Sequence, residues 1–496
     1  MEYDAIIIGA GAAGLASALK LSCAGKKILL LEKQPEPGGF GTSFSRKGFV
    51  FESSLHCVDG LAKDGEVRNF LEECGVDKKI EFISLKDFSR IIYPEHDFVA
   101  DFNRDNFINY LKKSFPKEAQ NLDLLFAEFD KFYIQFDRFS YSRLPAWLKL
   151  LISPFAYPAI IKISFLTFGE LVAKFISDEK LRAIISDIWR FIGLPPLKVS
   201  ALYFLLVFRG YYYKSTAYIR GGYSRVFGAM VERIREAGSE VRFNTAVKKI
   251  VVKKGLKCVI TDQEDEFKAK VIISNANCLD TLTNLLDNEI TKDEYSNKLA
   301  RMEKSVSAFQ VYMGLKVPAK VLGMNHFMFS VNSSYNHGNN FNYPLVGNYD
   351  RCPFSLVDHA QLDQALVPPG KGSLLIMILD AWSNWSNLTE EEYNEKKIQV
   401  ANRLISQAER YLPGLAKNIE VMEVATPRTI ARYGSSPEGA IYGFAQTVSQ
   451  SGMSRLAQKT KVKGLILAGA WTRPGAGVHA CFVSGIEAAD LALKLL

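Results

Sequence analysis

The stretch AIIIGAGAAG, residues 5–14, determines the fold that this sequence predicts. Its apolar, β-branched start is typical of a buried parallel strand, and the strand leads directly into a complete G-x-G-x-x-G motif. A helical pattern over residues 15–24 follows, and then a second apolar strand, residues 27–31, which ends at Glu32. We therefore predict a strand–turn–helix–strand unit that binds a dinucleotide.

Each part of this unit has a physical task. The three glycines permit a tight turn, a close approach of the backbone to a pyrophosphate, and close packing of the helix on the strand. The free N–H groups and the dipole at the helix N-terminus favour the negative charge of the pyrophosphate. Glu32, eighteen residues after Gly14, stands where a carboxylate accepts hydrogen bonds from two ribose hydroxyls. An acidic residue here indicates a free 2′-hydroxyl, and hence FAD or NAD.

A glycine pair distinguishes between FAD and NAD as the predicted cofactor. The Gly38–Gly39 pair begins six residues after Glu32 and allows a second backbone segment to approach a dinucleotide that is bound extended, as FAD is in flavoproteins. The chain has one dinucleotide motif and no Cys-x-x-Cys pair, which excludes an enzyme of the disulfide reductase type. FAD is the predicted cofactor.

The sequence of the C-terminal region predicts a second anion-binding site. Residues 464–469 read as a short buried strand, and the glycine-rich loop 470–478 opens a helix of small residues. A turn that serves packing alone is the alternative. The residues expected to contact FAD lie in these loops and at the neighbouring strand ends: Gly9, Gly11, Ala12, Ala13, Gly14, Glu32, Lys33, Gly38, Gly39, Val247, Ala276, Gly469, Ala470, Gly477 and Val478.

The composition limits the partners and the location. Hydrophobic residues make up 48% and aromatic residues 12%, enough to line a large apolar cavity as well as to fill a core. A net charge of +8 without basic blocks excludes nucleic acid and fits weak attraction to an anionic membrane. The seven cysteines are scattered, and no metal-ligand spacing or signal-peptide pattern occurs. We expect a cytoplasmic protein that attaches peripherally to a membrane.

An aromatic stretch, Leu144 to Ile176, is the predicted membrane contact. It combines Trp147, Phe155 and other apolar residues with three prolines and a small excess of lysine, as interfacial segments do. The alternative is a layer of core helices.

Several separated motifs together resemble one group of flavoproteins. They are the N-terminal motif, the Gly38–Gly39 and Gly221–Gly222 turns, residues 273–276 and residues 474–477. The whole chain resembles the bacterial phytoene desaturases, the carotenoid cis–trans isomerases and the retinol saturases, which share an amine-oxidase-like architecture. Many relatives have an aspartate where this chain has Ala470, so that contact with the cofactor is missing or replaced here.

The resemblance implies an α/β fold, in which a Rossmann-type FAD-binding domain with a three-layer, mostly parallel sheet carries an inserted α+β substrate-binding domain. It also implies an apolar polyene or isoprenoid lipid substrate, such as a carotenoid or retinoid, whose carbon–carbon double bonds are desaturated, saturated or isomerised. The expected division is three FAD-binding segments, a helical region for substrate and membrane contact, and a substrate-binding domain: 1–63, 214–285 and 421–496; 64–213; and 286–420.

Catalytic residues are less clearly marked. Four polar residues near the expected cofactor loops are candidates: Arg428, Tyr442, Arg473 and His479. Both arginines are better suited to binding a phosphate or carboxylate than to transferring a proton. For His479, the alternative to a catalytic role is a residue that only packs within its helix. Two other functions stay open: an amine-oxidase-like flavoenzyme on another hydrophobic substrate, and a non-enzymatic prenyl-lipid binder on the same fold.

Overall fold

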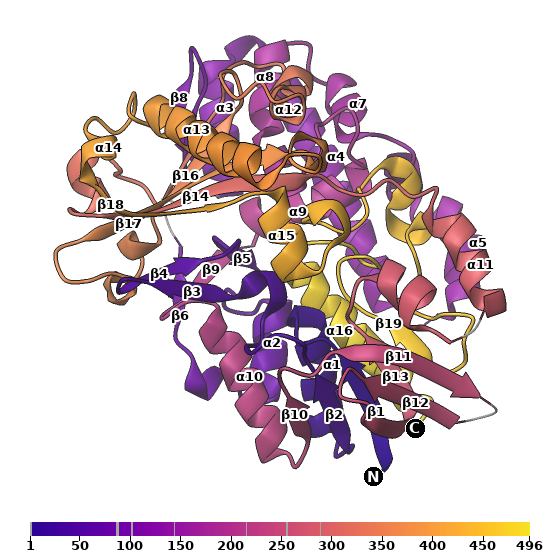
Figure 1. The fold of residues 1–496 in the computed structure, drawn as a ribbon. Helices are drawn as coiled ribbons and strands as arrows, with labels where there is room; N and C mark the ends of the chain where they lie inside the picture. The colour runs from indigo at the N-terminus through magenta and orange to yellow at the C-terminus, as the bar shows by residue number, and fades with distance from the viewer. Residues whose placement is uncertain are drawn as a thin grey trace.

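The fold is described from a computed structural model of the chain, which covers residues 2–85, 89–100, 103–142, 144–214, 216–253, 256–287 and 289–496. Two mixed sheets and a helical region make up most of it (Figure 1). Both termini lie close together at the lower edge of that view, beside the first sheet.

The first sheet is mostly parallel. In it β10, β2, β1, β13 and β19 run side by side in parallel, and the antiparallel hairpin β11–β12 joins the edge of β13. The sheet is assembled from separated parts of the chain: β1 (Glu2–Ile8), β2 (Ile28–Leu31), β10 (Glu240–Arg242), β11 (Val247–Lys253), β12 (Leu256–Thr261), β13 (Glu266–Ser274) and β19 (Leu465–Leu467).

Both faces of this sheet are covered by other elements. Side chains along β1 alternate in direction, so they pack into two different cores. Ala5 and Ile7 pack with α1 (Ala12–Cys23), α10 (Ser224–Glu236) and α16 (Val478–Leu493). Ile6 and Ile8 belong to a separate core that also contains residues of the β11–β12 hairpin and of α11 (Glu289–Leu299). The predicted three-layer Rossmann-type arrangement is confirmed.

The second sheet has the order β18–β14–β17–β16–β15–β7–β8, with β15 and β7 parallel and the other pairs antiparallel. Helix α13 (Glu390–Ala408) packs across one face of it (Figure 1). Its strands are β7 (Ser89–Ile92), β8 (Asp97–Ala100), β14 (Ser307–Leu315), β15 (Met328–Val331), β16 (Phe354–Val357), β17 (Gly372–Asp380) and β18 (Ile419–Ala425).

The segment 64–213 is mainly helical and also contains short strands. It contributes β7 and β8 to the second sheet, while β6 (Phe82–Ser84) pairs with β9 (Thr216–Ile219). Short β-branched and aromatic runs such as Ser89–Ile92 are too brief to stand out beside long helices. The remaining strands are β3 (Ser43–Arg46), β4 (Phe49–Glu52) and β5 (Val58–Asp59).

Helices fill the space beyond the second sheet, with a core rich in phenylalanine from α4 and α9. The helices not yet given are α2 (Glu66–Glu73), α3 (Arg104–Ser114), α4 (Ala119–Tyr141), α5 (Ala146–Ala156), α6 (Pro158–Ser164), α7 (Phe168–Ala173), α8 (Glu179–Ile185), α9 (Ala201–Tyr212), α12 (His337–Leu345), α14 (Leu415–Asn418) and α15 (Pro427–Gly434). Among the helices so described, none is long and apolar enough to cross a membrane.

The aromatic stretch 144–176 divides between core and surface. Ile163 and Phe168 are buried in the helical core. Phe155 is 89% exposed and Phe165 74% exposed, on α5 and directly after α6. The side chain of Trp147 lies outside the part of the chain that the structure describes. The core interpretation therefore holds for part of the stretch, and membrane contact stays a prediction for the exposed part.

Candidate cofactor and substrate site

A single large cavity of about 1590 Å³ connects the loops of the first sheet with the second sheet. Its second-sheet wall follows from the alternation along β14: Ala308, Gln310 and Tyr312 line the cavity, whereas Phe309 and Val311 face α13. The cavity also reaches α4, where Phe136, Asp137, Ser140 and Tyr141 line it, and Phe139 of the same helix packs against Tyr157 of the aromatic stretch.

The first glycine loop is shaped by close contacts of the backbone. Gly9 has φ +93°, a conformation that L-residues with a side chain rarely adopt. A Cβ on Gly14 would lie 1.9 Å from the carbonyl oxygen of Gly9, so this position requires glycine if α1 is to pack on β1. Gly11 and Gly38 form a β-bridge, and the Gly38 amide donates to the Ala10 carbonyl over 2.8 Å. The second glycine turn thus lies beside the first.

Two helix N-termini open into the cavity without a side-chain cap. The first turn of α1 follows Gly11, and that of α16 follows Gly477; in the described part of the chain neither helix has a side-chain hydrogen bond at its N-cap. The two helices pack tightly, since a Cβ on Gly485 of α16 would lie 2.2 Å from the carbonyl oxygen of Ala13. Uncapped, partly buried N–H groups at the positive end of a helix dipole favour the binding of an anion.

Glu32 places a buried carboxylate on the cavity wall. Its side chain is 8% exposed, and its two oxygens accept from the backbone amides of Ala10, over 2.6 Å, and Gln34, over 2.8 Å. These bonds fix the carboxylate beside the glycine loop. Each oxygen keeps capacity for a further hydrogen bond, which suits the two hydroxyls of a ribose.

These observations fit an extended dinucleotide, with anion sites at two helix ends and a carboxylate beside the first. Most residues predicted to contact FAD line the cavity: Gly9, Gly11, Ala12, Ala13, Glu32, Lys33, Gly38, Gly39, Val247, Ala276, Ala470, Gly477 and Val478. Gly14 and Gly469 are not part of the lining. Gly14 packs against the loop from behind, and Gly469 faces the side chain of Asn275, which does line the cavity.

Arg455 holds the C-terminal loop, and the sequence analysis missed it. The side chain is 1% exposed and donates to the carbonyls of Thr472, over 2.8 Å, Phe444 and Ala470. Burial lowers the pKa of its guanidinium to about 10. Arg455 precedes the strand β19 in a loop with no motif, so no sequence signal marks it.

His479 is the catalytic candidate whose surroundings are most distinctive. It lies in the first turn of α16 and lines the cavity, and its Nδ1 donates to Asp59 over 2.8 Å, with Glu66 3.5 Å from Nε2. Burial alone would lower the pKa of the imidazole, but the Asp59 and Glu66 carboxylates outweigh it and raise the pKa to about 10. The side chain therefore carries a proton at neutral pH.

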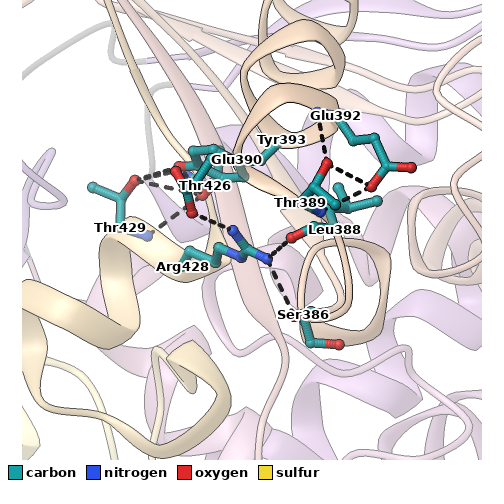
Figure 2. A network of polar contacts seen from close by, with 9 residues as sticks. All are labelled: Ser386, Leu388, Thr389, Glu390, Glu392, Tyr393, Thr426, Arg428 and Thr429. Carbon is teal, nitrogen blue, oxygen red and sulfur yellow. Dashed lines mark hydrogen bonds and ion pairs between the residues drawn. The ribbon is translucent and has the colours of Figure 1, made fainter.

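Arg428 is not brought to the cavity. Its guanidinium forms an ion pair with Glu390 over 3.1 Å, donates to the carbonyls of Ser386 and Leu388, and lies over the ring of Tyr393 (Figure 2). These partners surround the start of α13, where Thr389 forms the N-cap. Arg428 thus joins α15 to α13 and has a structural role.

The two remaining candidates differ. Arg473 donates to the carbonyls of Arg455 and Met453 and is absent from the cavity lining, so it stabilises its own loop. Tyr442 lines the cavity, and its ring packs against Gly193. Burial raises the pKa of the Tyr442 hydroxyl, which keeps it neutral.

A family model for flavin containing amine oxidoreductases matches residues 12–493. Among curated proteins, the chain is 28% identical to the chloroplastic prolycopene isomerase of Daucus carota, over 99% of this chain and 81% of that protein. It is 27% identical to the neurosporene-forming phytoene desaturase of Rhodobacter capsulatus, over 97% and 92%. Identity to the all-trans-retinol 13,14-reductase of Danio rerio is 22%, over 94% and 82%.

Solved structures show the same fold. An oxidoreductase from Methanosarcina mazei matches with a TM-score of 0.67 at 16% identity, over 99% of this chain and 100% of that chain. Putrescine oxidase bound to putrescine matches with a TM-score of 0.65 at 16% identity, over 100% and 99%. The amine-oxidase-like architecture expected from the sequence is therefore confirmed.

Proposed function

The chain belongs to the family of flavin containing amine oxidoreductases, and from this premise we propose that it desaturates, saturates or isomerises carbon–carbon double bonds of a long apolar polyene. Its cofactor is a flavin, and the dinucleotide site described above suits FAD. The relatives named for prolycopene isomerisation, phytoene desaturation and retinol reduction support the proposed substrate class.

The observation that carries the proposal is the size and character of the cavity. Its volume of about 1590 Å³ exceeds the roughly 300–1,000 Å³ of ordinary ligand pockets, so it has room for a dinucleotide and a second long ligand. Beyond the glycine loops its walls are largely aromatic and aliphatic, which suits a conjugated chain with few polar atoms. These wall residues include Phe44, Phe136, Phe191, Leu206, Val207, Tyr211, Met377 and Ile441.

Bound FAD supplies hydride or electron transfer at its ring. The chain's own residues provide the rest of the proposed site. Glu32 and the first turn of α1 bind and orient the dinucleotide, and the apolar walls exclude water from the polyene. The protonated imidazole of His479 lines the cavity, and among the described residues its Nε2 has only a long contact, 3.5 Å, with Glu66, so His479 is the group best placed to hold a proton there.

The domain division remains part of the proposal. Its support is that the strands of the first sheet come from the segments 1–63, 214–285 and 421–496, while most strands of the second sheet come from 286–420.

The test is product mass after anaerobic incubation of oxidised and of reduced protein with a panel of polyenes. A mass change of about minus two, plus two or zero with altered geometry identifies desaturation, saturation or isomerisation. A panel of hydrophobic amines runs in parallel. Oxidation of an amine with every polyene unchanged would contradict the proposal and favour the amine-oxidase-like alternative.

Peripheral membrane attachment of a cytoplasmic protein completes the proposal. Three large apolar side chains of the stretch, Leu151, Phe155 and Phe165, are exposed, and Tyr157 of the same stretch packs against Phe139 of α4, a helix that lines the cavity. Lys174 is exposed in the same stretch, and Lys162 pairs with Glu128. An apolar ligand that partitions into bilayers would enter the cavity from this side.

Changing Phe155 and Phe165 to serine is expected to weaken binding to anionic vesicles at least about tenfold, since each ring contributes up to about 1.5–3 kcal/mol when fully buried. Raising the salt concentration removes only the electrostatic part, about 1 kcal/mol per lysine near the surface. Co-sedimentation with vesicles at two salt concentrations measures both. The control changes Val321 and Val346, apolar side chains outside the stretch that are also well exposed, at 67% and 75%. Equal sedimentation of the two double variants would refute the attachment site.

A further inference from the structure

One imidazole on the cavity wall lacks any polar partner. His56 lines the cavity and is 9% exposed, and neither its Nδ1 nor its Nε2 has a hydrogen-bond partner among the described residues. Leaving a buried polar group unpaired is unfavourable, because the group has lost its hydrogen bonds to water and gained none in return. Such a group in a ligand cavity indicates a polar atom on the ligand.

The neighbouring residues that the structure describes do not form hydrogen bonds with the ring nitrogens of His56. Its ring lies 5.6 Å from the ring of His359, whose Nε2 is already paired with the Leu55 carbonyl over 3.1 Å. Asp59, three residues further along the chain, binds His479. Burial lowers the pKa of His56 to about 4, so the imidazole is neutral at pH 7.

A neutral imidazole has one N–H donor and one acceptor nitrogen. A hydroxyl group can pair with either nitrogen, because it both accepts and donates. A pure hydrocarbon can pair with neither and would leave both nitrogens desolvated. Residues 53–58 of this wall follow β4 in the chain and include none of the residues to which the dinucleotide contacts are assigned above.

We infer that His56 recognises an oxygen atom of the substrate, and that the preferred substrate is a hydroxylated polyene rather than a polyene hydrocarbon. The inference rests on the proposed function, whose substrate class it narrows. His56 acts here as a specificity-determining residue, and sites built to hydrogen-bond a hydroxyl discriminate strongly against ligands that lack it.

The experiment compares matched ligands on the FAD-loaded protein. One pair is a C20 polyene alcohol and the hydrocarbon with methyl in place of hydroxymethyl; the other is a C40 carotene and its monohydroxy derivative. Dissociation constants and kcat/KM are measured for the wild type, for His56→Phe and for His326→Phe, a control outside the cavity lining. FAD affinity is measured for each variant without polyene.

The wild type and the control should bind each alcohol at least about tenfold more tightly than its hydrocarbon, and His56→Phe should abolish the difference. His56→Gln, which keeps a donor and an acceptor, should restore part of it. Equal affinity of the wild type for both members would overturn the inference, as would a preference that survives in His56→Phe. Weakened FAD binding by His56→Phe would also overturn it, because the cofactor would then be the partner. If no polyene binds or reacts at all, the proposed function itself fails.

Discussion

Replacing Glu32 by alanine should weaken FAD binding on the order of a hundredfold or more while the chain stays folded. The carboxylate is positioned by the amides of Ala10 and Gln34 and faces the cavity. A charge-assisted hydrogen bond to each of two ribose hydroxyls contributes about 1.5–3 kcal/mol, and both are lost in the variant. Quenching of flavin fluorescence on titration of apoprotein gives the dissociation constant, and circular dichroism reports the fold.

The matched control is Glu73→Ala on α2, an exposed glutamate outside the cavity lining, which should leave FAD affinity unchanged. Glu32→Gln should fall between the wild type and Glu32→Ala, since the amide keeps one acceptor oxygen and loses the charge. If Glu32→Ala binds FAD as tightly as the wild type, Glu32 is merely a charge at the end of a strand.

Replacing Arg455 by methionine is expected to cost about 3 kcal/mol or more of unfolding free energy. Methionine fills similar space but cannot donate, so the carbonyls of Phe444, Ala470 and Thr472 lose their shared partner. A hydrogen bond from a charged group contributes about 1.5–3 kcal/mol, and stranded carbonyls add a desolvation cost. Since Ala470 lines the cavity, FAD affinity should fall as well.

Urea unfolding of the apoprotein measures the free energy change, with FAD titration as a second readout. Arg410→Met, at an exposed position, is the control and should stay within about 0.5 kcal/mol of the wild type. Equal stability of the two variants would show that the loop 469–477 holds its shape without Arg455.

Local sequence patterns predicted the cofactor half of the fold well. The strand, glycine turn, helix and second strand around Gly9 form a contiguous unit whose geometry depends on neighbours in the chain, and β1, α1 and β2 occur where expected. The same holds for α16 after Gly477. Glycine positions are informative because backbone contacts such as that between Gly14 and Gly9 admit no side chain.

Contacts between distant segments were beyond sequence reasoning. The roles of Arg428 and Arg455 depend on carbonyls of other loops, and no periodicity reveals which carbonyls those are. The pairing of β7 with β15 joins residues more than 200 positions apart. His479 was a candidate for its place after the glycine loop, but its carboxylate partner Asp59 emerged only from the fold.

The aromatic stretch shows a different limit. Composition marks Leu144 to Ile176 as apolar, yet burial depends on which side of each short helix meets α4 and α9. Phe168 stacks on Phe204 in the core, whereas Phe165, three residues earlier, faces outward. A stretch broken by prolines has no single helical phase, so a sequence pattern cannot assign its two sides.

The most direct test of the central claim is the absorbance spectrum of the purified protein before and after acid precipitation. The uncapped N-termini of α1 and α16, together with Glu32, predict one non-covalently bound FAD per chain. The native protein should be yellow, and acid should release the flavin into the supernatant in a one-to-one ratio. A colourless protein that cannot be reconstituted with FAD would contradict the account.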